Sequence, residues 1–370
     1  MSIVINANNF PTFFADGAVT EPLFLPPNGT RTKYPIGWRG LGRYTQGSLR
    51  IWRSGVKLLP GTDYTEEANG VFFDFAVAPS SVGKITDYVI CYVPRAADVS
   101  KTQSRNLFMV PNWLNSIGLD ECSFIGRNIA SRSNATATSA GSTTTAQSAQ
   151  GVVPWVSLSR DAARNACIAA GGHLTRNREY GNIIRWQIAH DIYPTGNSVS
   201  GADGMGVAAA PDPTQAGRTL TGSGPVTWAH NLLAGGILDL VGNCWEYTEG
   251  LELRDGVFWV ENVNNELVSS GISLDITATS GSAYSALVSG TYADDCLPTK
   301  NAGDPIRGAD GCWYNKSGSM LLFRGGRWSN GALCGPCAFA VDSPVGFAGG
   351  VYYAFRLAFS RSEFDALPNS

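Results

Sequence analysis

Helical periodicity is confined to two consecutive stretches of the chain, and this feature most restricts the folds open to it. The first stretch begins with Ser159, a favoured N-cap residue, and runs to Ala170, where a Gly-Gly pair ends it. The second has Thr175 as its cap and carries an apolar stripe as far as His190. Elsewhere short β-rich runs alternate with turns rich in Gly and Pro. We therefore expect an α+β fold in which two helices lie within a loop-rich β framework.

Residues 37–94 carry the pattern of a small β domain. Turn sequences such as Ser54-Gly55 separate short strand-like runs. The stretch 53–93 resembles the small β modules of phage tail fibres and appendages. We expect a β-rich, phage tail-like module over residues 1–103 and a second domain over residues 104–370.

Two loops interrupt the second domain, over residues 134–151 and 198–217. The first is rich in Ser, Thr, Ala and Gln, the second in Gly, Ala and Pro, and neither has a hydrophobic period. Because the segments on either side fit one fold, we expect surface loops and not linkers, the first of them flexible.

The low charge of the chain excludes two classes of partner. Charged residues make up 15% and the formal net charge is -3, so the clustered Lys and Arg that bind nucleic acid or anionic lipid are missing. Residues 1–16 lack the basic start and apolar run of a signal peptide, and no apolar run has the length of a membrane span. We expect no nucleic acid partner, no membrane insertion and no signal peptide, in a protein soluble in the cytoplasm or carried on a virion.

Four segments, taken in chain order, resemble one family. They are PWVSLSRDAARNACIAAGGHLTRNREY (154–180), GGILDLVGNCWEYTEG (235–250), FRGGRWSNG (323–331) and YYAFRLAFS (352–360). Together they are similar to the C-type lectin fold of the formylglycine-generating-enzyme, or sulfatase-modifying-factor, type. The resemblance implies a C-type lectin-like domain over residues 104–370.

Residues within these segments have physical reasons to form a scaffold. The Gly-Asn turn permits positive φ, the Gly-Gly pair permits close backbone approach, and the Trp residues anchor a core with few regular strands. Arg356 lies on an otherwise apolar strand and needs an acceptor, which Glu246 or a ring of backbone carbonyls would provide. The scaffold set is Gly242, Asn243, Trp245, Glu246, Gly325, Gly326, Trp328 and Arg356.

The residues that make members of this family enzymes do not match here. The resemblance places the two copper-binding cysteines of the oxidases at Asn330 and Gly335, whereas this chain has Cys334 and Cys337 in another register. Its three histidines lack the short ligand spacing of the iron site in sulfoxide-forming relatives. We expect no catalytic residue, no metal and no cofactor. The alternative is a copper oxidase or sulfoxide synthase of this fold, with Cys334 and Cys337 as a shifted copper site.

The C-G-P-C sequence at 334–337 also matches the redox motif of thioredoxin-like proteins. No helical period follows it, so the strand-to-helix context that activates such a thiol is not predicted. A zinc site shared with Cys296 and Cys312 would lack a second C-x-x-C. The remaining interpretation of Cys334 and Cys337 is that they are two small side chains on a loop, without a redox or metal-binding role.

Residues 329–352 indicate a role without chemistry. They lie between the GGxW and FR motifs, where the variable proteins of diversity-generating retroelements, of the major-tropism-determinant type, carry their variable region. Adenine-specific mutagenesis of Asn codons cannot write Lys, Glu, Gln, Met or Trp. These five types supply 37 of 370 residues, yet none falls within this window of 24.

The resemblance implies that side chains of this window are displayed on one face and bind a ligand, the alternative being an ordinary packed loop with strand. The expected set is Ser329, Asn330, Leu333, Cys334, Cys337, Val341, Asp342, Gly346, Phe347, Gly349, Val351 and Tyr352. We expect a non-enzymatic, hypervariable receptor-binding protein for phage host attachment, with a protein or glycan receptor on a cell surface. A homotrimer would strengthen weak individual contacts.

Overall fold

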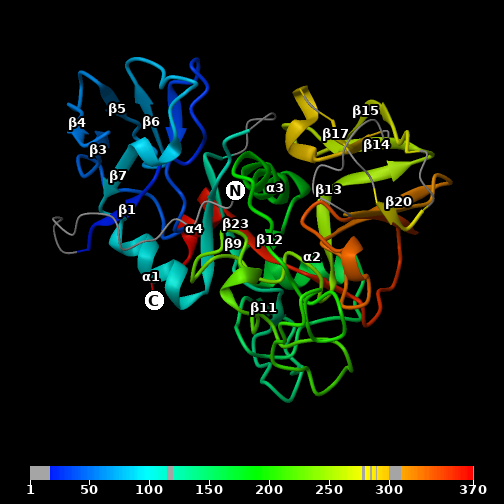
Figure 1. The fold of residues 1–370 in the computed structure, drawn as a ribbon. Helices are drawn as coiled ribbons and strands as arrows, with labels where there is room; N and C mark the ends of the chain where they lie inside the picture. The colour runs from blue at the N-terminus through cyan, green and yellow to red at the C-terminus, as the bar shows by residue number, and fades with distance from the viewer. Residues whose placement is uncertain are drawn as a thin grey trace.

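The computed structural model describes residues 17–114, 120–276, 280–283, 286–288, 290–299 and 310–369. Residues 1–16, to which the signal-peptide prediction refers, lie outside these ranges. Figure 1 shows a β-rich amino-terminal part, drawn in blue and cyan, beside a larger part in which α3 lies between two sheets. Among the described residues, no helix combines the length and the apolar character needed to cross a membrane.

Two small antiparallel sheets form the amino-terminal part. One has the order β1-β7-β3-β4 and the other β2-β6-β5. Their strands are β1 (Val19–Glu21), β2 (Lys33–Pro35), β3 (Arg50–Arg53), β4 (Val56–Lys57), β5 (Tyr64–Glu66), β6 (Phe72–Phe75) and β7 (Tyr88–Tyr92), with the 3-10 turn η2 (Ile85–Asp87) before β7. The sheets meet through aromatic side chains, since Phe75 contacts both Tyr34 and Tyr88 with ring centroids 5.6 and 5.5 Å apart. The short strands predicted between residues 37 and 94 are confirmed.

A four-stranded sheet follows, and it combines the first strands of the larger part with the last strand of the chain. Its order is β12-β23-β9-β8, from β8 (Leu107–Pro111), β9 (Cys122–Gly126), β12 (His173–Leu174) and β23 (Leu357–Ser360). The antiparallel pairing of β23 with β9 returns the end of the chain to the start of the larger part.

Two helices of this region were not predicted, α1 (Ala96–Ser104) and α4 (Arg361–Ala366). α1 has no apolar stripe, because its buried residues are Asp98, Lys101 and Thr102. α4 has only six residues and depends on a capping box, in which Ser360 and Glu363 bond each other's backbone N–H groups.

The two predicted helices are present as α2 (Arg160–Ala169) and α3 (Asn177–Ala189). Ser159 caps α2 as expected, accepting a hydrogen bond from the Ala162 N–H. α3 instead begins after Arg176, whose N–H donates to the Glu179 carboxylate. Thr175 is therefore not the cap, because its hydroxyl donates to the carbonyl of Arg356 on the neighbouring strand.

The largest sheet has the order β15-β14-β13-β20-β21-β19-β16, with β22 parallel to β13. Its strands are β13 (Trp245–Arg254), β14 (Val257–Glu261), β15 (Leu267–Ser273), β16 (Ser282–Ala283), β19 (Gly311–Tyr314), β20 (Ser319–Arg324), β21 (Phe339–Pro344) and β22 (Tyr353–Phe355). Short elements complete the fold: β10 (Ser131–Arg132) with β11 (Ala146–Gln147), β17 (Ala286–Leu287) with β18 (Pro298–Thr299), and the 3-10 turns η3 (Val226–Trp228), η4 (Gly290–Asp295) and η5 (Gly331–Leu333). This sheet-rich structure with few helices confirms the α+β class, while the lectin-like assignment and the domain limits stay predictions.

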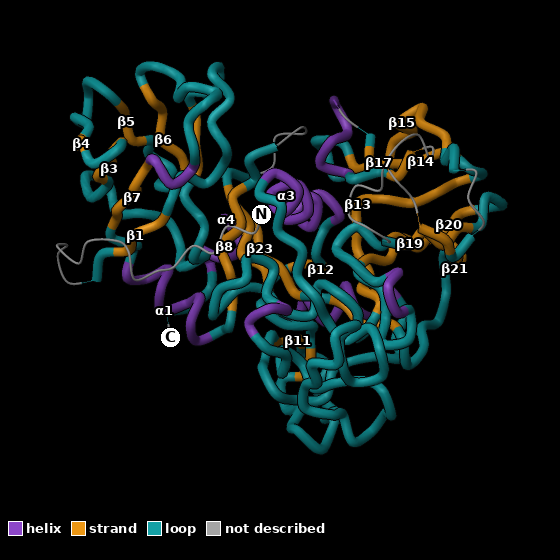
Figure 2. The backbone as a smooth tube through the Cα atoms, viewed as in Figure 1, coloured by secondary structure: helices purple, strands orange, loops and turns teal. Residues whose placement is uncertain are grey.

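The first predicted loop contains β11 and belongs to the loop-rich region around it, drawn in teal in Figure 2. The Gly151 N–H donates to the Thr221 carbonyl, and the Gln150 amide to that of Gly222. Within the first loop, the Asn134 side chain accepts from the N–H groups of Ser142 and Thr143. The loop is at the surface as expected, and hydrogen bonds organise it.

The predicted scaffold residues make the contacts expected of them. Arg356, with 0% exposure, donates to both Glu246 oxygens at 2.9 and 2.7 Å and to the carbonyls of Gly126 and Leu238. Gly242 and Asn243 have φ of 70° and 57°. A Cβ on Gly326 would lie 2.6 Å from the Cys334 sulfur. The Arg356–Glu246 pair links β13 to the residue between β22 and β23, and Gly242 and Gly326 permit close approach to Asn197 and Cys334.

Candidate functional site

The residues predicted to be displayed fall into three groups. Four are exposed: Ser329, Asp342, Gly346 and Val351. Six are half-buried: Asn330, Leu333, Cys334, Phe347, Gly349 and Tyr352. Two are buried: Cys337 and Val341. Ten of the twelve positions are therefore accessible in whole or in part.

For Cys337 and Val341 the prediction of display is wrong. Their exposures are 2% and 0%, and both pack in one apolar cluster with Phe339. Side chains alternate along β21, so Phe339 and Val341 face the core and Asp342 faces solvent. Cys337 precedes this strand, and its N–H donates to the Asp310 carboxylate.

A tight turn over residues 327–334 carries one part of the accessible set. The Asn330 side-chain oxygen accepts from the Arg327 N–H, and the Asn330 N–H donates to the Arg327 carbonyl, both at 3.0 Å. The Cys334 thiol donates to the same carbonyl at 3.1 Å. Asn330 and Cys334 therefore fix the turn, and Ser329 extends from it into solvent.

The segment 345–352 carries another part of the set. Phe347 packs against Phe323 and Tyr353, with ring centroids 6.3 and 4.9 Å apart, so it anchors the segment to the sheet. Gly349 approaches the Leu158 backbone so closely that an added Cβ would lie 2.1 Å from that carbonyl oxygen. Val351 remains 38% exposed at the end of the segment.

The loop over 198–217, which the sequence indicated only as a surface loop, borders the same surface. The Ser200 N–H donates to the Trp328 carbonyl at 2.7 Å, and the Gly331 N–H to the Ser198 carbonyl at 3.0 Å. Gly217 lies against the Trp328 ring, where a Cβ would come within 2.6 Å. Val199, between Ser198 and Ser200 in this loop, is 51% exposed. The glycine content of this loop was the available signal, since glycine permits such an approach to an aromatic ring.

Aromatic and cationic groups meet where these segments join. The Tyr352 ring lies 4.8 Å from the Trp328 ring, and the Arg327 guanidinium carbon lies 4.0 Å from the Tyr352 centroid. The Arg218 guanidinium, paired with Asp212 at 2.6 Å, donates to the Val351 carbonyl. We name the surface formed by Val199, Arg327, Ser329, Asn330, Val351 and Tyr352 the display surface.

The environment of Cys334 and Cys337 bears on the redox and copper alternatives. Within the described residues neither cysteine forms a disulfide, and burial raises the pKa of Cys334 to about 12. A thiol at neutral pH is a poor nucleophile and must lose its proton to bind a metal. In the part of the chain that the structure describes, no group of three or more His, Cys, Asp or Glu side chains could hold a metal ion. Cys334 also follows η5 and leads into β21, so it does not begin a helix.

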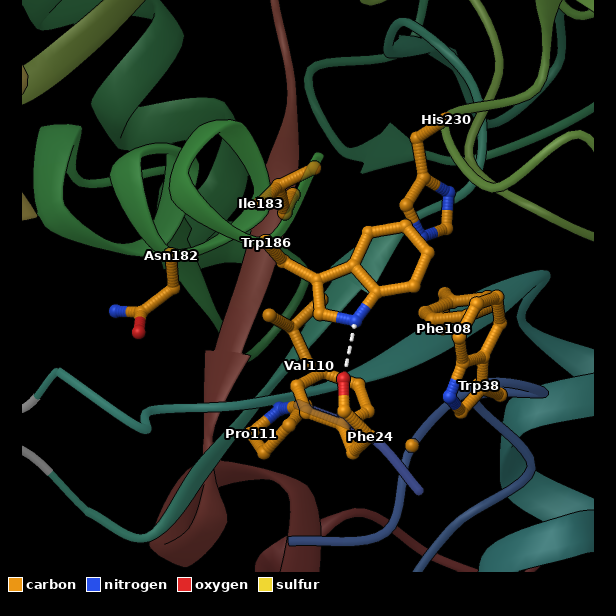
Figure 3. A pocket seen from close by; sticks show the side chains of 10 residues that line it. Phe24, Trp38, Phe108, Val110, Pro111, Asn182, Ile183, Trp186 and His230 are labelled. Carbon is orange, nitrogen blue, oxygen red and sulfur yellow. Dashed lines mark hydrogen bonds between the residues drawn. The ribbon is translucent and has the colours of Figure 1, made fainter. Parts of the chain in front are cut away.

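An apolar cavity between the amino-terminal part and α3 is too small to be a ligand site. Its volume is about 10 Å³, which is close to the minimum for one water molecule. Figure 3 shows Trp186 at its centre, donating from Nε1 to the Phe24 carbonyl at 3.0 Å. The Trp38 ring meets the Trp186 ring edge-on at 4.7 Å. This region is an aromatic junction between the two parts of the chain.

Comparison with known proteins gives a weak structural likeness and no sequence match. No protein-family model and no curated protein matches the chain. Among solved structures, the chain is weakly similar to one titled "Major Tropism Determinant P3c Variant". The TM-score is 0.32 and the sequence identity 10%, over 89% of this chain and 86% of that chain.

Proposed function

We propose that this protein binds a receptor on a cell surface through the display surface and performs no chemistry. The observation that carries the proposal is the construction of this surface. Its exposed side chains belong to turns that backbone hydrogen bonds, glycine contacts and the Phe347 anchor hold in place. Exposed positions of this kind can change with little effect on stability, because they contribute little packing.

The same proposal includes a retroelement as the source of the sequence variation and a phage tail as the location of the protein. Residues 329–352 form the variable region of a retroelement-diversified protein with a C-type lectin-like fold over residues 104–370. The module over residues 1–103 attaches it to a phage tail, and a homotrimer multiplies its contacts with the host. The absence of Lys, Glu, Gln, Met and Trp from the window supports this origin.

Substitution of exposed residues tests the binding role. We expect the combined variant Val199→Ala, Ser329→Ala and Val351→Ala, all at exposed positions of the display surface, to melt within about 2 °C of the parent, since surface changes cost little. Adsorption of the labelled full-length chain to its bacterial host, found by screening a strain panel in flow cytometry, should fall at least tenfold.

A matched control carries Val77→Ala and Val82→Ala, at valines of the amino-terminal part that are 81% and 90% exposed. This control should adsorb like the parent. A large drop in melting temperature of the triple variant, or undiminished adsorption, would contradict the display role. The retroelement origin is tested separately by the adjacent DNA, which should hold a reverse transcriptase gene and a near-copy of codons 329–352 that differs at adenines.

A further inference from the structure

Arg327 differs from the paired arginines around it. Arg218 and Arg356 form ion pairs with Asp212 and Glu246. Within the described residues, the Arg327 side chain has no ion pair and no hydrogen bond, and its Nε is buried without a partner. Among the described residues nothing accepts a hydrogen bond from its two terminal nitrogens, and unlike Nε they are not fully buried. A guanidinium held in this way can bind an incoming acceptor.

The position of this guanidinium is already fixed. It lies 4.0 Å from the Tyr352 centroid, and the Trp328 ring supports Tyr352 at 4.8 Å. The backbone of Arg327 is tied to Asn330 from both its N–H and its carbonyl. Stacking on an aromatic face reduces the side-chain freedom that would be lost on binding, and this favours affinity.

The surroundings of Arg327 indicate the chemistry of its partner. Ser329, Val199 and Val351 provide one small polar and two exposed apolar side chains on the adjoining segments. Arg327 also interacts electrostatically with the Asp342 carboxyl, without forming an ion pair with it. A lone cation with apolar groups beside it does not match a polyanion, which needs several clustered cations. It matches a single carboxylate bordered by apolar side chains, and Arg binds carboxylates through two parallel hydrogen bonds.

We propose that the terminal nitrogens of Arg327 bind an Asp or Glu carboxylate of a protein receptor, at a site where apolar receptor side chains contact Val199 and Val351. The inference rests on the proposed function and names the class of receptor that the display surface takes. Arg327 lies outside the variable window of 329–352, so this contact would persist while the neighbouring side chains change.

A random 12-residue peptide library, panned on the full-length chain, tests the inference. Peptides selected by the parent should be enriched in Asp or Glu next to apolar residues. Replacing the acid of a selected peptide by its amide should weaken binding to the parent about tenfold, the size expected when one charge-assisted bidentate contact is lost. Arg327→Gln should abolish this acid-over-amide preference, and Arg327→Lys should keep part of it.

Arg132 offers a matched control, because its guanidinium carbon also lies 4.0 Å from an aromatic centroid, that of Trp155, while it donates to the Thr143 carbonyl. Arg132→Gln should retain the preference. The inference is overturned if the parent selects no peptide, shows no acid preference, or keeps that preference as Arg327→Gln. Alginate is a polysaccharide that also carries carboxylates. If the chain binds an alginate surface and no peptide, the choice of a protein receptor is wrong.

The result also separates this inference from the proposed function. If Ser329→Ala with Val351→Ala abolishes peptide binding while Arg327→Gln leaves the acid preference intact, the display surface stands and the role of Arg327 fails. If the alanine variants leave both peptide binding and cell adsorption unchanged, the display surface itself fails.

Discussion

His173 should make the stability of this protein depend on pH above neutrality. The side chain is buried, and both ring nitrogens face carboxylates, Nδ1 at 2.6 Å from Glu363 and Nε2 at 3.1 Å from both Glu179 oxygens. An imidazole donates from both nitrogens only when it is protonated. Burial opposes the charge on His173, but the two carboxylates outweigh it and raise the pKa to about 10.

The sign and size of the effect follow from this shift. A folded-state pKa above the unfolded value of about 6.5 stabilises the fold fully below pH 6.5, and the contribution is lost as pH rises towards 10. The difference between a folded-state pKa of about 10 and an unfolded pKa of about 6.5 corresponds to about 5 kcal/mol as an upper limit. The Glu363 side chain is 34% exposed, so solvent screens its interaction with His173. We therefore expect protonated His173 to contribute about 2–3 kcal/mol to the free energy of unfolding. Burial disfavours the Glu179 carboxylate, yet His173 and its hydrogen bonds lower the pKa of Glu179 to about 2, so acid removes the same interaction only below about pH 4.5.

The measurement is urea unfolding followed by tryptophan fluorescence at pH 5.5, 6.5, 8 and 9.5. The parent should have a free energy of unfolding about 2–3 kcal/mol larger than that of His173→Gln at pH 5.5 and 6.5. This difference should shrink steadily as the pH rises to 8 and 9.5. His190→Gln is the control, because burial lowers the pKa of His190 to about 4 and leaves it neutral throughout this range. A parent-minus-variant difference that does not change between pH 6.5 and 9.5 would refute the charged-histidine account.

Two further predictions concern the scaffold and the thiols. Glu246→Leu should lower the free energy of unfolding by about 3–5 kcal/mol in urea titrations, because it leaves the buried Arg356 charge uncompensated. Glu246→Gln, which still accepts from Arg356, should cost less, and equal losses would contradict this reasoning. The desalted chain should retain well under one equivalent of added copper by mass spectrometry, since Cys334 stays protonated at neutral pH. Stoichiometric copper that disappears in Cys334→Ser would support the oxidase alternative instead.

The sequence predicted features that depend on local chemistry. Ser159 caps α2, and the pairing of Arg356 with Glu246 followed from the need of a buried guanidinium for an acceptor. The prediction that Thr175 caps a helix is wrong because its hydroxyl can take either of two roles, and the outcome depends on Arg356, which is distant in the chain. Local rules cannot decide between a nearby and a distant partner.

At the candidate site, too, local features could be predicted and features that depend on distant contacts could not. Val341 was expected at the surface, and its burial depends on the register of β21 with β19 and β20, which a single strand does not reveal. The window 329–352 follows from its place between the GGxW and FR motifs, and its composition agrees with that assignment. The contribution of Val199, and the free guanidinium of Arg327 beside the window, required the packing of distant loops.

The aromatic junction at Trp186 has a mechanical consequence. The Phe24 carbonyl and the Trp38 ring hold α3 against the amino-terminal part, and Arg43 of that part pairs with Asp365 in α4. Force applied at the amino-terminal end would thus reach the larger part through packed rings and an ion pair as well as through the connecting chain. Under the proposed function, copies mounted on one particle would present their display surfaces at a set angle, and the spacing of receptors on the target would decide how many engage at once.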